Sequence, residues 1–235
     1  MRVSVIIPTH NEAQSISRVL ADLPADIVTE VLVVDSNSTD GTPEIASKMG
    51  ARIVREPRRG YGRACLTGLA SASSPDVVVF LDGDYSDRPD ELPLLLAPII
   101  DGRADITLGS RLGKQSIHGA LPWHAAFGNR LAAGLIRFLY GVRISDLGPF
   151  RAGRADVLRR LELQENTYGW AVEIILKGAL SGFRIVEVPV SYYPRIGESK
   201  ISGTLRGTIG AAWFILFLIL RYSFRRRMAG TPRPA

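Results

Sequence analysis

Two carboxylates separated by a glycine, Asp82 and Asp84, directly follow a run of five apolar residues at 77–81. An unbroken apolar run is typical of a strand that is buried on both faces of a parallel sheet. The carboxylates would then lie at the carboxyl end of this strand, where open α/β sheets bind their ligands. Gly83 permits a tight bend, so both carboxylates can converge on one small, hard cation. The same residues also suit an ordinary solvated turn, so this motif alone leaves two interpretations open.

Two further apolar runs end in polar loops. Residues 31–34 lead into Asp35 and a loop rich in Ser, Asn and Thr that reaches Thr42. Residues 6–8 lead into Thr9, His10, Asn11 and Glu12. Three strands that deliver polar loops to one edge of a sheet are the usual construction of a nucleotide site in open α/β folds. Their joint occurrence favours such a site over three unrelated capped turns.

The elements that must position these loops alternate between strand and helix along the first half of the chain. This alternation predicts an α/β fold with a mostly parallel sheet flanked by helices. The second half is less regular, but it also contains helical and strand-like segments. We expect strands at 3–8, 27–35, 52–54, 77–82, 106–110 and 184–190, and helices at 15–23, 42–49, 61–72, 89–100, 122–140 and 168–181.

Length and composition fit one large domain of this kind. The chain has 235 residues, of which 46% are hydrophobic, and this is enough for a well-buried core. Its single cysteine, Cys65, allows no internal disulfide and suits a reducing cytoplasm. The amino-terminal residues run directly into the first expected strand without a charged leader, so we expect no signal peptide.

The net charge of +6 is concentrated at the carboxyl end. From Lys200 onward the chain has seven cations and no acid, whereas residues 1–199 have 22 cations and 23 acids. A near-neutral body argues against a nucleic-acid partner, because such proteins usually spread basic residues over a folded face. Residues 205–220 are strongly apolar but fall short of the roughly 20 residues that cross a bilayer. With the arginines that follow, they predict a helix that lies at an anionic membrane surface or is buried against a partner.

Six motifs in a fixed order make the interpretation specific. The motifs are Ile7-Pro8-Thr9-His10-Asn11-Glu12, residues 34–42, Leu81-Asp82-Gly83-Asp84, Gly109-Ser110-Arg111, Ser145-Asp146 with Phe150-Arg151, and residues 195–200. In this order the sequence resembles family 2 glycosyltransferases with the GT-A fold, in particular the polyprenyl-phosphate branch typified by dolichyl-phosphate mannosyl- and glucosyltransferases. The resemblance implies a Rossmann-like GT-A domain over 1–204, an interfacial helix over 205–228 and a basic flexible tail over 229–235.

The resemblance implies that a divalent cation, Mg²⁺ or Mn²⁺, is held against the diphosphate of a nucleotide-sugar. Asp84 would bind this cation, and Asp82 would contact the ribose, the cation or a water bound to it. Ser86 stands where the family often has a glutamine ligand, so Ser86, water or Asp87 would complete the shell. The donor nucleotide would be held by Pro8, Asn11, Glu12, Asp35, Asp40, Gly62 and Asp82. A glycine-rich loop at 59–63 precedes a helix whose exposed amino terminus would suit an anion.

On the acceptor side the resemblance implies a polyprenyl phosphate. Its phosphate would be bound by Arg111, Arg130, Ser199 and Lys200, because guanidinium groups match phosphate oxygens. Arg195 and Lys200 would also stabilise the leaving diphosphate, so the catalytic set is Asp84, Arg111, Arg195 and Lys200. The family pattern Asp-x-x-Ser-Gly-Phe-Arg reads Asp146-Leu147-Gly148-Pro149-Phe150-Arg151 here, which puts the acceptor contacts of this loop in question.

The predicted activity is transfer of a hexose to the lipid phosphate with inversion at the anomeric carbon. It would take place at the cytoplasmic face of a membrane, with the protein bound peripherally. A second interpretation keeps the donor site but has a soluble acceptor, and the carboxyl-terminal helix then serves as an oligomer contact. A third is a sugar-phosphate nucleotidyltransferase, although residues 8–12 lack the early glycine-rich loop of that class. A fourth is a nucleotide-binding module without catalytic activity.

Overall fold

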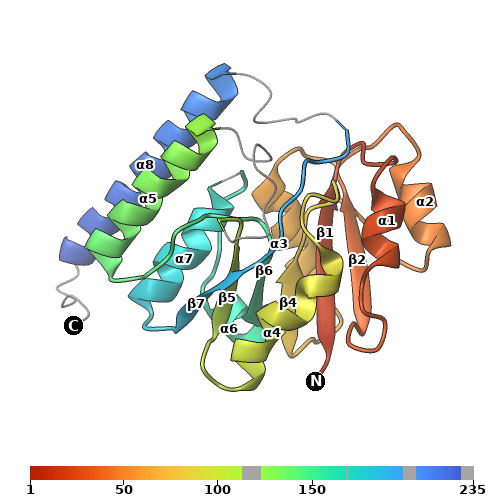
Figure 1. Cartoon of the computed structure of the whole chain (residues 1–235), viewed down its shortest axis with the longest axis horizontal. Helices are drawn as coiled ribbons and strands as arrows, with labels where there is room; N and C mark the ends of the chain where they lie inside the picture. Colours follow the sequence, from red (N-terminus) through yellow and green to blue (C-terminus); the bar gives the residue numbers. More distant parts are fainter. Residues whose placement is uncertain (113–122, 168, 198–204, 229–235) are drawn as a thin grey trace.

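The apolar runs of the sequence form the central strands of a seven-stranded sheet (Figure 1). The computed structural model describes residues 1–112, 123–167, 169–197 and 205–228. The strand order is β3-β2-β1-β4-β6-β5-β7, and β6 runs antiparallel to both of its neighbours. The strands are β1 (Val3–Thr9), β2 (Glu30–Asp35), β3 (Arg52–Arg55), β4 (Val77–Phe80), β5 (Ile106–Ser110), β6 (Arg151–Arg154) and β7 (Ile185–Pro189).

Helices cover both faces of this sheet. One core contains Ile6, Val78 and Phe80, and the helices α3, α5, α6, α7 and α8 pack around it. The other core contains Val5 and Val79 and is covered by α1, α2 and α4. The helices are α1 (Ile16–Ala21), α2 (Thr42–Lys48), α3 (Tyr61–Ser71), α4 (Leu92–Ile100), α5 (Trp123–Tyr140), α6 (Ala155–Arg160), α7 (Trp170–Leu180) and α8 (Leu205–Met228).

Alternate residues of the central strands enter opposite cores. In β4, Val78 and Phe80 face one core, and Val77 and Val79 face the other. All four side chains are buried, which explains why the strand is apolar without interruption. β1, β2 and β4 are parallel, so their carboxyl ends lie at one edge of the sheet. This register brings the three predicted polar loops together.

The structure confirms the α/β prediction and corrects several of its elements. The strand expected at 27–35 begins at Glu30, because the N–H groups of residues 27 and 28 bond to the carbonyl of Pro24 in a turn. A 3₁₀ turn, Pro89–Glu91, precedes α4. β6 and α6 were not predicted. Arg151–Arg154 lacks an apolar pattern and owes its strand conformation to pairing with β4 and β5.

The carboxyl-terminal helix is part of the folded body. Leu218 and Ile219 of α8 are buried, and the Tyr140 hydroxyl of α5 donates to the Ile219 carbonyl at 2.6 Å. The Tyr222 hydroxyl donates to Glu173 of α7 at 3.0 Å. Among the residues that the structure describes, no helix has the length and apolarity to cross a membrane. The tail predicted at 229–235 lies outside the described residues.

Candidate active site

Both carboxylate oxygens of Asp84, in the loop after β4, have partners in the protein. The N–H and the hydroxyl of Ser86 donate to Oδ1, at 2.9 and 2.6 Å. Nη2 of Arg195 lies 3.2 Å from Oδ2. In this structure Ser86 orients the Asp84 carboxylate. Its role as a metal ligand stays a prediction.

Gly83 packs this loop closely against the loop after β1. A Cβ at Gly83 would lie 3.0 Å from a methyl group of Thr9 and 3.4 Å from Cγ of Glu12. The hydroxyl of Ser15 donates to the Gly83 carbonyl at 2.7 Å. A larger residue at this position would push the two loops apart. The glycine thus keeps Asp82 and Asp84 beside the predicted nucleotide loop, which begins just after Pro8 of β1.

Two carboxylates near Asp84 have unmet hydrogen-bonding capacity. One oxygen of the half-buried Asp82 and both oxygens of the buried Asp87 lack a hydrogen-bond partner. Burial raises the pKa of Asp82 to about 7, and the negative charge of Asp84 adds to this effect. Burial also raises the pKa of Asp87, helped by the charge of Asp82. Such groups cost folding free energy unless a ligand or a proton meets them, so they indicate where a ligand binds.

The donor atoms of this loop fit a hard divalent cation. Asp84 and the unpartnered oxygen of Asp82 supply the oxygen ligands that Mg²⁺ and Mn²⁺ prefer. Within the described part of the chain, no three His, Cys, Asp or Glu side chains converge to hold a metal ion on their own. Mg²⁺ commonly binds through one or two carboxylates together with substrate phosphates. The site therefore suits a cation that is shared with a phosphate ligand.

The predicted nucleotide residues after β1 and β2 also brace their loops. Asn11 accepts a hydrogen bond from the N–H of Thr39 at 2.9 Å, and Asp40 accepts one from the N–H of Ala13 at 2.9 Å. Asp35 accepts from the N–H three residues further on, at 3.1 Å. Burial acts against the ionised form of Asp40, but its hydrogen bonds outweigh this and lower its pKa. These loops are therefore held in place before any nucleotide arrives.

Two N–H groups at the start of α3, where we expect an anion to fit, already have partners in the protein, and the anion contact stays a prediction. The N–H groups of Gly62 and Arg63 donate to the carbonyls of Thr167 and Asn166, at 3.1 and 3.0 Å. These two donors are thus occupied by backbone carbonyls. A Cβ at Gly62 would lie 2.3 Å from the carbonyl of Glu165, so the glycine is required by close packing of two backbones. A nucleotide contact by Gly62 stays a prediction.

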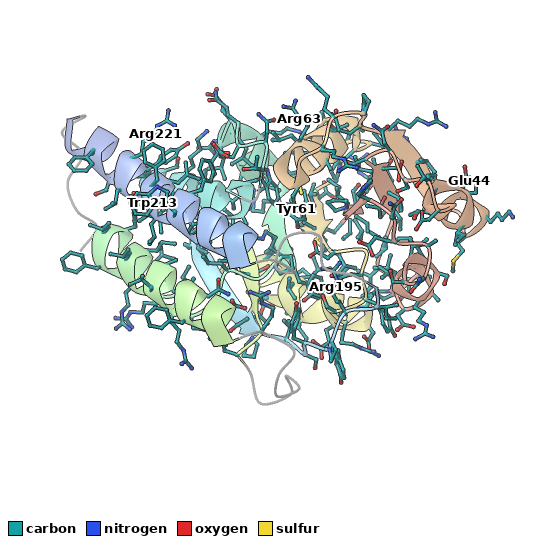
Figure 2. All side chains as sticks on the ribbon, turned by 90° about the horizontal axis from the view of Figure 1, so that it is seen from above. Glu44, Tyr61, Arg63, Arg195, Trp213 and Arg221 are labelled. Atoms are coloured by element: carbon teal, nitrogen blue, oxygen red, sulfur yellow. The ribbon has the colours of Figure 1, made fainter. Side chains whose placement is uncertain are left out.

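The segment that carries Arg195 is docked on the carboxylate loop. The N–H of Tyr193 donates to the carbonyl of Ser86, and the N–H of Ile196 donates to that of Asp84, both at 2.9 Å. Arg195 also lies 3.6 Å from a carboxylate oxygen of Glu12. Figure 2 shows Arg195 near the centre of the molecule. Arg195, which we expect to stabilise the leaving diphosphate, thus forms an ion pair with Asp84 in this structure, and its expected role stays a prediction.

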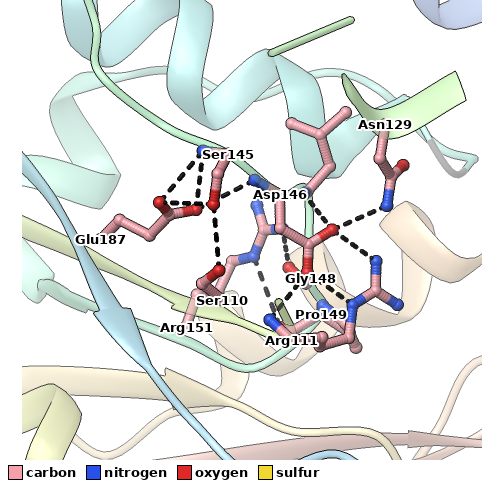
Figure 3. A network of polar contacts seen from close by, with 10 residues as sticks. Ser110, Arg111, Asn129, Ser145, Asp146, Gly148, Pro149, Arg151 and Glu187 are labelled. Carbon is pink, nitrogen blue, oxygen red and sulfur yellow. Dashed lines mark hydrogen bonds and ion pairs between the residues drawn. The ribbon is translucent and has the colours of Figure 1, made fainter. Parts of the chain in front are cut away.

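Arg111 and Asp146 form the centre of a second polar cluster (Figure 3). The N–H and Nε of Arg111 donate to Oδ2 of Asp146 at 3.0 and 2.7 Å, and Nη2 donates to Oδ1 at 2.8 Å. Asn129 of α5 and the N–H of Leu147 also donate to Oδ1, at 2.7 and 2.8 Å. Burial acts to lower the pKa of Arg111, but its bonds to Asp146 outweigh this and raise it. The guanidinium is thus held in one orientation as a permanent cation.

Glu187 of β7 fixes the loop that carries Asp146. It accepts hydrogen bonds from the N–H groups of Ser145 and Asp146, each at 2.9 Å. The side chain of Arg151 donates to the carbonyls of Gly148 and Ala171 and is buried. Hydrogen bonds to Glu187 and from Arg151 therefore hold the loop that contains Pro149. Arg151 stabilises this loop from the protein interior.

The acceptor set predicted from the sequence is only partly brought together. Arg130 is exposed on α5, one residue from the inward-facing Asn129. Ser199 and Lys200 lie outside the described residues. Sequence reasoning missed Asn129, Glu187 and Tyr192, whose ring lies 5.1 Å from the guanidinium carbon of Arg111. No local signal marks these three, because each acts on a partner that is distant in the sequence.

The site is distinguished by its chemistry rather than by the depth of a cavity. A hollow of about 570 Å³ lies at the opposite edge of the sheet, where Met1, Val77, Ile99 and Arg159 line it. None of these residues belongs to the predicted motifs. The unpartnered carboxylates instead lie at the carboxyl edge, which is where open α/β sheets bind ligands.

Comparison with known proteins decides the family. Residues 4–162, more than half of the chain, match the family described as glycosyl transferase family 2. The chain belongs to this family. It is 38% identical over 202 residues to a dolichyl-phosphate hexose transferase of Haloferax volcanii, with 85% of this chain and 86% of that protein covered. It is 36% identical over 226 residues to an undecaprenyl-phosphate mannosyltransferase of Micrococcus luteus, with 88% and 90% covered.

A solved structure agrees with the fold of this family 2 chain. Glucosyl-3-phosphoglycerate synthase from Mycobacterium tuberculosis, crystallised with Mg²⁺ and uridine diphosphate, matches with a TM-score of 0.76 at 23% identity. The match covers 94% of this chain and 79% of that one. The same enzyme has also been crystallised with Mn²⁺ and uridine diphosphate. The chain is therefore a glycosyltransferase whose sheet and flanking helices have the GT-A arrangement.

Proposed function

We propose that this glycosyltransferase moves a hexose from a nucleoside-diphosphate sugar to a polyprenyl phosphate, with inversion and with a divalent cation. The observation that carries the proposal is the group of carboxylates at the carboxyl edge of β4. Asp82 and Asp87 have oxygens without partners, and Asp84 beside them is paired with Arg195. A cation bound to a diphosphate would account for both observations. The carboxylate oxygens would bind the cation, and Arg195 would bind the phosphate oxygens.

Asp84 and Asp82 are the residues that would hold Mg²⁺ or Mn²⁺. The bound cation would neutralise the negative charge that develops on the leaving nucleoside diphosphate. A structural neighbour with the same fold has been crystallised with Mg²⁺ or Mn²⁺ and uridine diphosphate, and this supports the use of such a cation. Ser86 fixes the direction of the Asp84 carboxylate through two hydrogen bonds.

The acceptor phosphate would attack the anomeric carbon directly. A phosphate monoester has a second pKa of about 6, so it is largely a dianion at neutral pH and needs no general base. A new bond forms between its oxygen and the anomeric carbon as the bond to the diphosphate oxygen breaks, and the electron pair leaves with the nucleoside diphosphate. Arg111, oriented by Asp146, is a fixed cation for the incoming phosphate. Attack from the side opposite the leaving group inverts the anomeric configuration.

The relatives support a lipid acceptor. The names of two relatives with more than 35% identity state dolichyl phosphate and undecaprenyl phosphate. We infer that this chain also works on a polyprenyl phosphate, bound peripherally at the cytoplasmic face of a membrane. The soluble phosphoglycerate acceptor of the structural relative belongs to a protein of only 23% identity, for which the likeness concerns the fold.

A donor screen tests the proposed function. Purified protein is mixed with a short, water-soluble polyprenyl phosphate and a panel of nucleotide-sugars in Mg²⁺ or Mn²⁺, and nucleoside diphosphate release is measured. We expect release that requires both the acceptor and the cation. Release with a saccharide or a phosphoglycerate but not with the polyprenyl phosphate would assign a soluble acceptor. Donor binding without release from any acceptor would indicate a non-catalytic nucleotide-binding module.

A further inference from the structure

The helices α5 and α8 each carry a stripe of large apolar side chains that faces solvent. On α8, Trp213, Phe217, Leu220 and Phe224 recur every three or four residues and therefore share one face. They are 74%, 50%, 46% and 62% exposed. On α5, Phe127, Leu131 and Phe138 lie four and seven residues apart, so they also share one face, and they are 66%, 46% and 72% exposed. Two neighbouring helices thus repeat one pattern.

The protein body fixes the direction of both stripes. Ala132, Ala133, Ile136 and Tyr140 are buried on the other side of α5, and Leu218 and Ile219 on the other side of α8. The bond from the Tyr140 hydroxyl to the Ile219 carbonyl joins the two helices on this inner side. Figures 1 and 2 show α5 and α8 side by side at one end of the molecule in both views. The stripes therefore belong to one outer surface, which we call the α5/α8 surface.

The charge of these helices matches an anionic surface. The sequences of α5 and α8 contain no Asp or Glu, and they contain the arginines 130, 137, 206, 221 and 225–227. Arg130, Arg137 and Arg221 are exposed. Aromatic side chains and arginines without acids are the composition of helices that lie in the headgroup region of a membrane. Exposed apolar residues elsewhere, such as Leu94 and Ile100 of α4, have no such arginines on their helix.

We propose that the α5/α8 surface docks on an anionic lipid bilayer, with α5 and α8 both lying in the interface. The proposal deepens the proposed function, on which it rests for a lipid acceptor, and it adds α5 to the carboxyl-terminal helix as half of the membrane contact. It also connects the membrane with the acceptor cluster. Asn129 points inward from α5 to Asp146, between the outward-facing Phe127 and Leu131. One helix therefore carries the stripe on its outer face and a contact to the Arg111 cluster on its inner face.

Vesicle binding tests the proposal without any catalytic readout. The full chain is centrifuged with vesicles of phosphatidylcholine alone or with phosphatidylglycerol added, and the floating fraction is measured. We expect binding only to the anionic vesicles and weaker binding at high salt. The double substitution Phe127→Ser and Phe138→Ser should reduce the partition coefficient at least tenfold. Ile100→Ser, which removes an equally exposed apolar side chain from α4, is the matched control and should bind like the unchanged chain.

The possible outcomes separate this proposal from the proposed function. Turnover of a short, water-soluble polyprenyl phosphate should be the same in the double variant and in the unchanged chain. Turnover without vesicle binding would overturn the docking proposal alone, and vesicle binding without turnover would overturn the proposed function alone. Equal binding by the α5 variant would also overturn the proposal. So would a dimer, seen by sedimentation equilibrium, that the α5 substitutions dissociate, because a second copy would then cover the surface.

Discussion

The two halves of the candidate site treat their carboxylates in opposite ways. Asp146, on the acceptor side, receives hydrogen bonds from Arg111, Asn129 and Leu147, and its charge is paired within the protein. Asp82 and Asp87, on the donor side, have oxygens that no group of the described chain meets. Asp146 has its partners within the protein and holds Arg111 in place, whereas we propose that a cation and a diphosphate complete the donor side. We therefore expect Asp146 to matter mainly for stability and the donor-side carboxylates to matter mainly for activity.

The difference also predicts opposite effects on stability. Removing one partner of a buried ion pair costs much folding free energy, because the other charge remains buried without a partner. A carboxylate without partners is already a cost, so its neutralisation stabilises the fold and harms the function. Substitutions in the two halves should therefore separate activity from stability.

Asp84→Asn gives the largest expected effect. We expect at least a thousandfold loss of kcat, because the amide cannot hold the cation against the diphosphate. The thermal midpoint should fall less than for Asp146→Asn, because the partner left behind, Arg195, is 29% exposed and is reached by solvent. Asp90→Asn, which changes an exposed carboxylate in the 3₁₀ turn Pro89–Glu91, is the matched control and should keep full activity. Full activity of Asp84→Asn in the presence of a metal chelator would contradict the metal-assisted account.

Asp146→Asn should cause the largest loss of stability. It leaves the buried Arg111 guanidinium without its counter-charge, which costs about 3 kcal/mol by comparison with broken buried pairs elsewhere. The free energy of unfolding is measured by urea titration. Asp105→Asn breaks the more exposed pair with Arg184 and should cost less than about 1 kcal/mol. If the two variants lost the same free energy of unfolding, the acceptor cluster would not stabilise the fold more than an exposed ion pair does.

Asp82→Asn should stabilise the protein while it lowers the activity. The pKa of about 7 means that the folded protein holds this proton more tightly than the unfolded chain, whose carboxyl has a pKa of about 3.9. The contribution of Asp82 to stability is thus present at low pH and is lost as pH rises through 7. The variant should melt a few degrees higher at pH 8, and this gain should shrink towards pH 5. A lower melting temperature of the variant at pH 8 would contradict the claim that the unpartnered Asp82 carboxylate destabilises the fold.

Arg195→Gln should have the smallest effect in this series. The quantity that it changes is the affinity for the metal ion. Arg195 lies on the Asp84 oxygen that faces away from Ser86, so it competes with a cation for that carboxylate. We expect several-fold tighter binding of Mn²⁺ alone, measured by electron paramagnetic resonance, together with a lower kcat. Arg88→Gln removes a cation that pairs with Asp22 and Asp90 in the same region and should leave Mn²⁺ affinity unchanged. Weaker Mn²⁺ binding by Arg195→Gln would show that the arginine supports the metal site instead.

The donor half could be predicted from the sequence because its residues follow apolar strands directly. Asp35 is the last residue of β2 and Asp82 lies just after β4, and parallel pairing brings these strand ends to one edge. In the acceptor half, Arg111 also follows a buried strand, β5, but its contacts could not be predicted in this way. Asp146 lies 35 positions from Arg111 and 17 from Asn129, and only the folded chain brings the three together. Their contact depends on the packing of α5, which no local pattern specifies.

The most direct test of the account is to identify the product of transfer. The unchanged chain and Asp84→Asn are incubated with the donor found in the screen and an equimolar mixture of a short polyprenyl phosphate and a soluble phosphorylated acceptor. Products are assigned by mass spectrometry, and the anomeric configuration by NMR. The account predicts a hexosyl polyprenyl phosphate with inverted configuration from the unchanged chain and none from the variant. Transfer to the soluble acceptor alone, or a product that retains the donor's configuration, would contradict it.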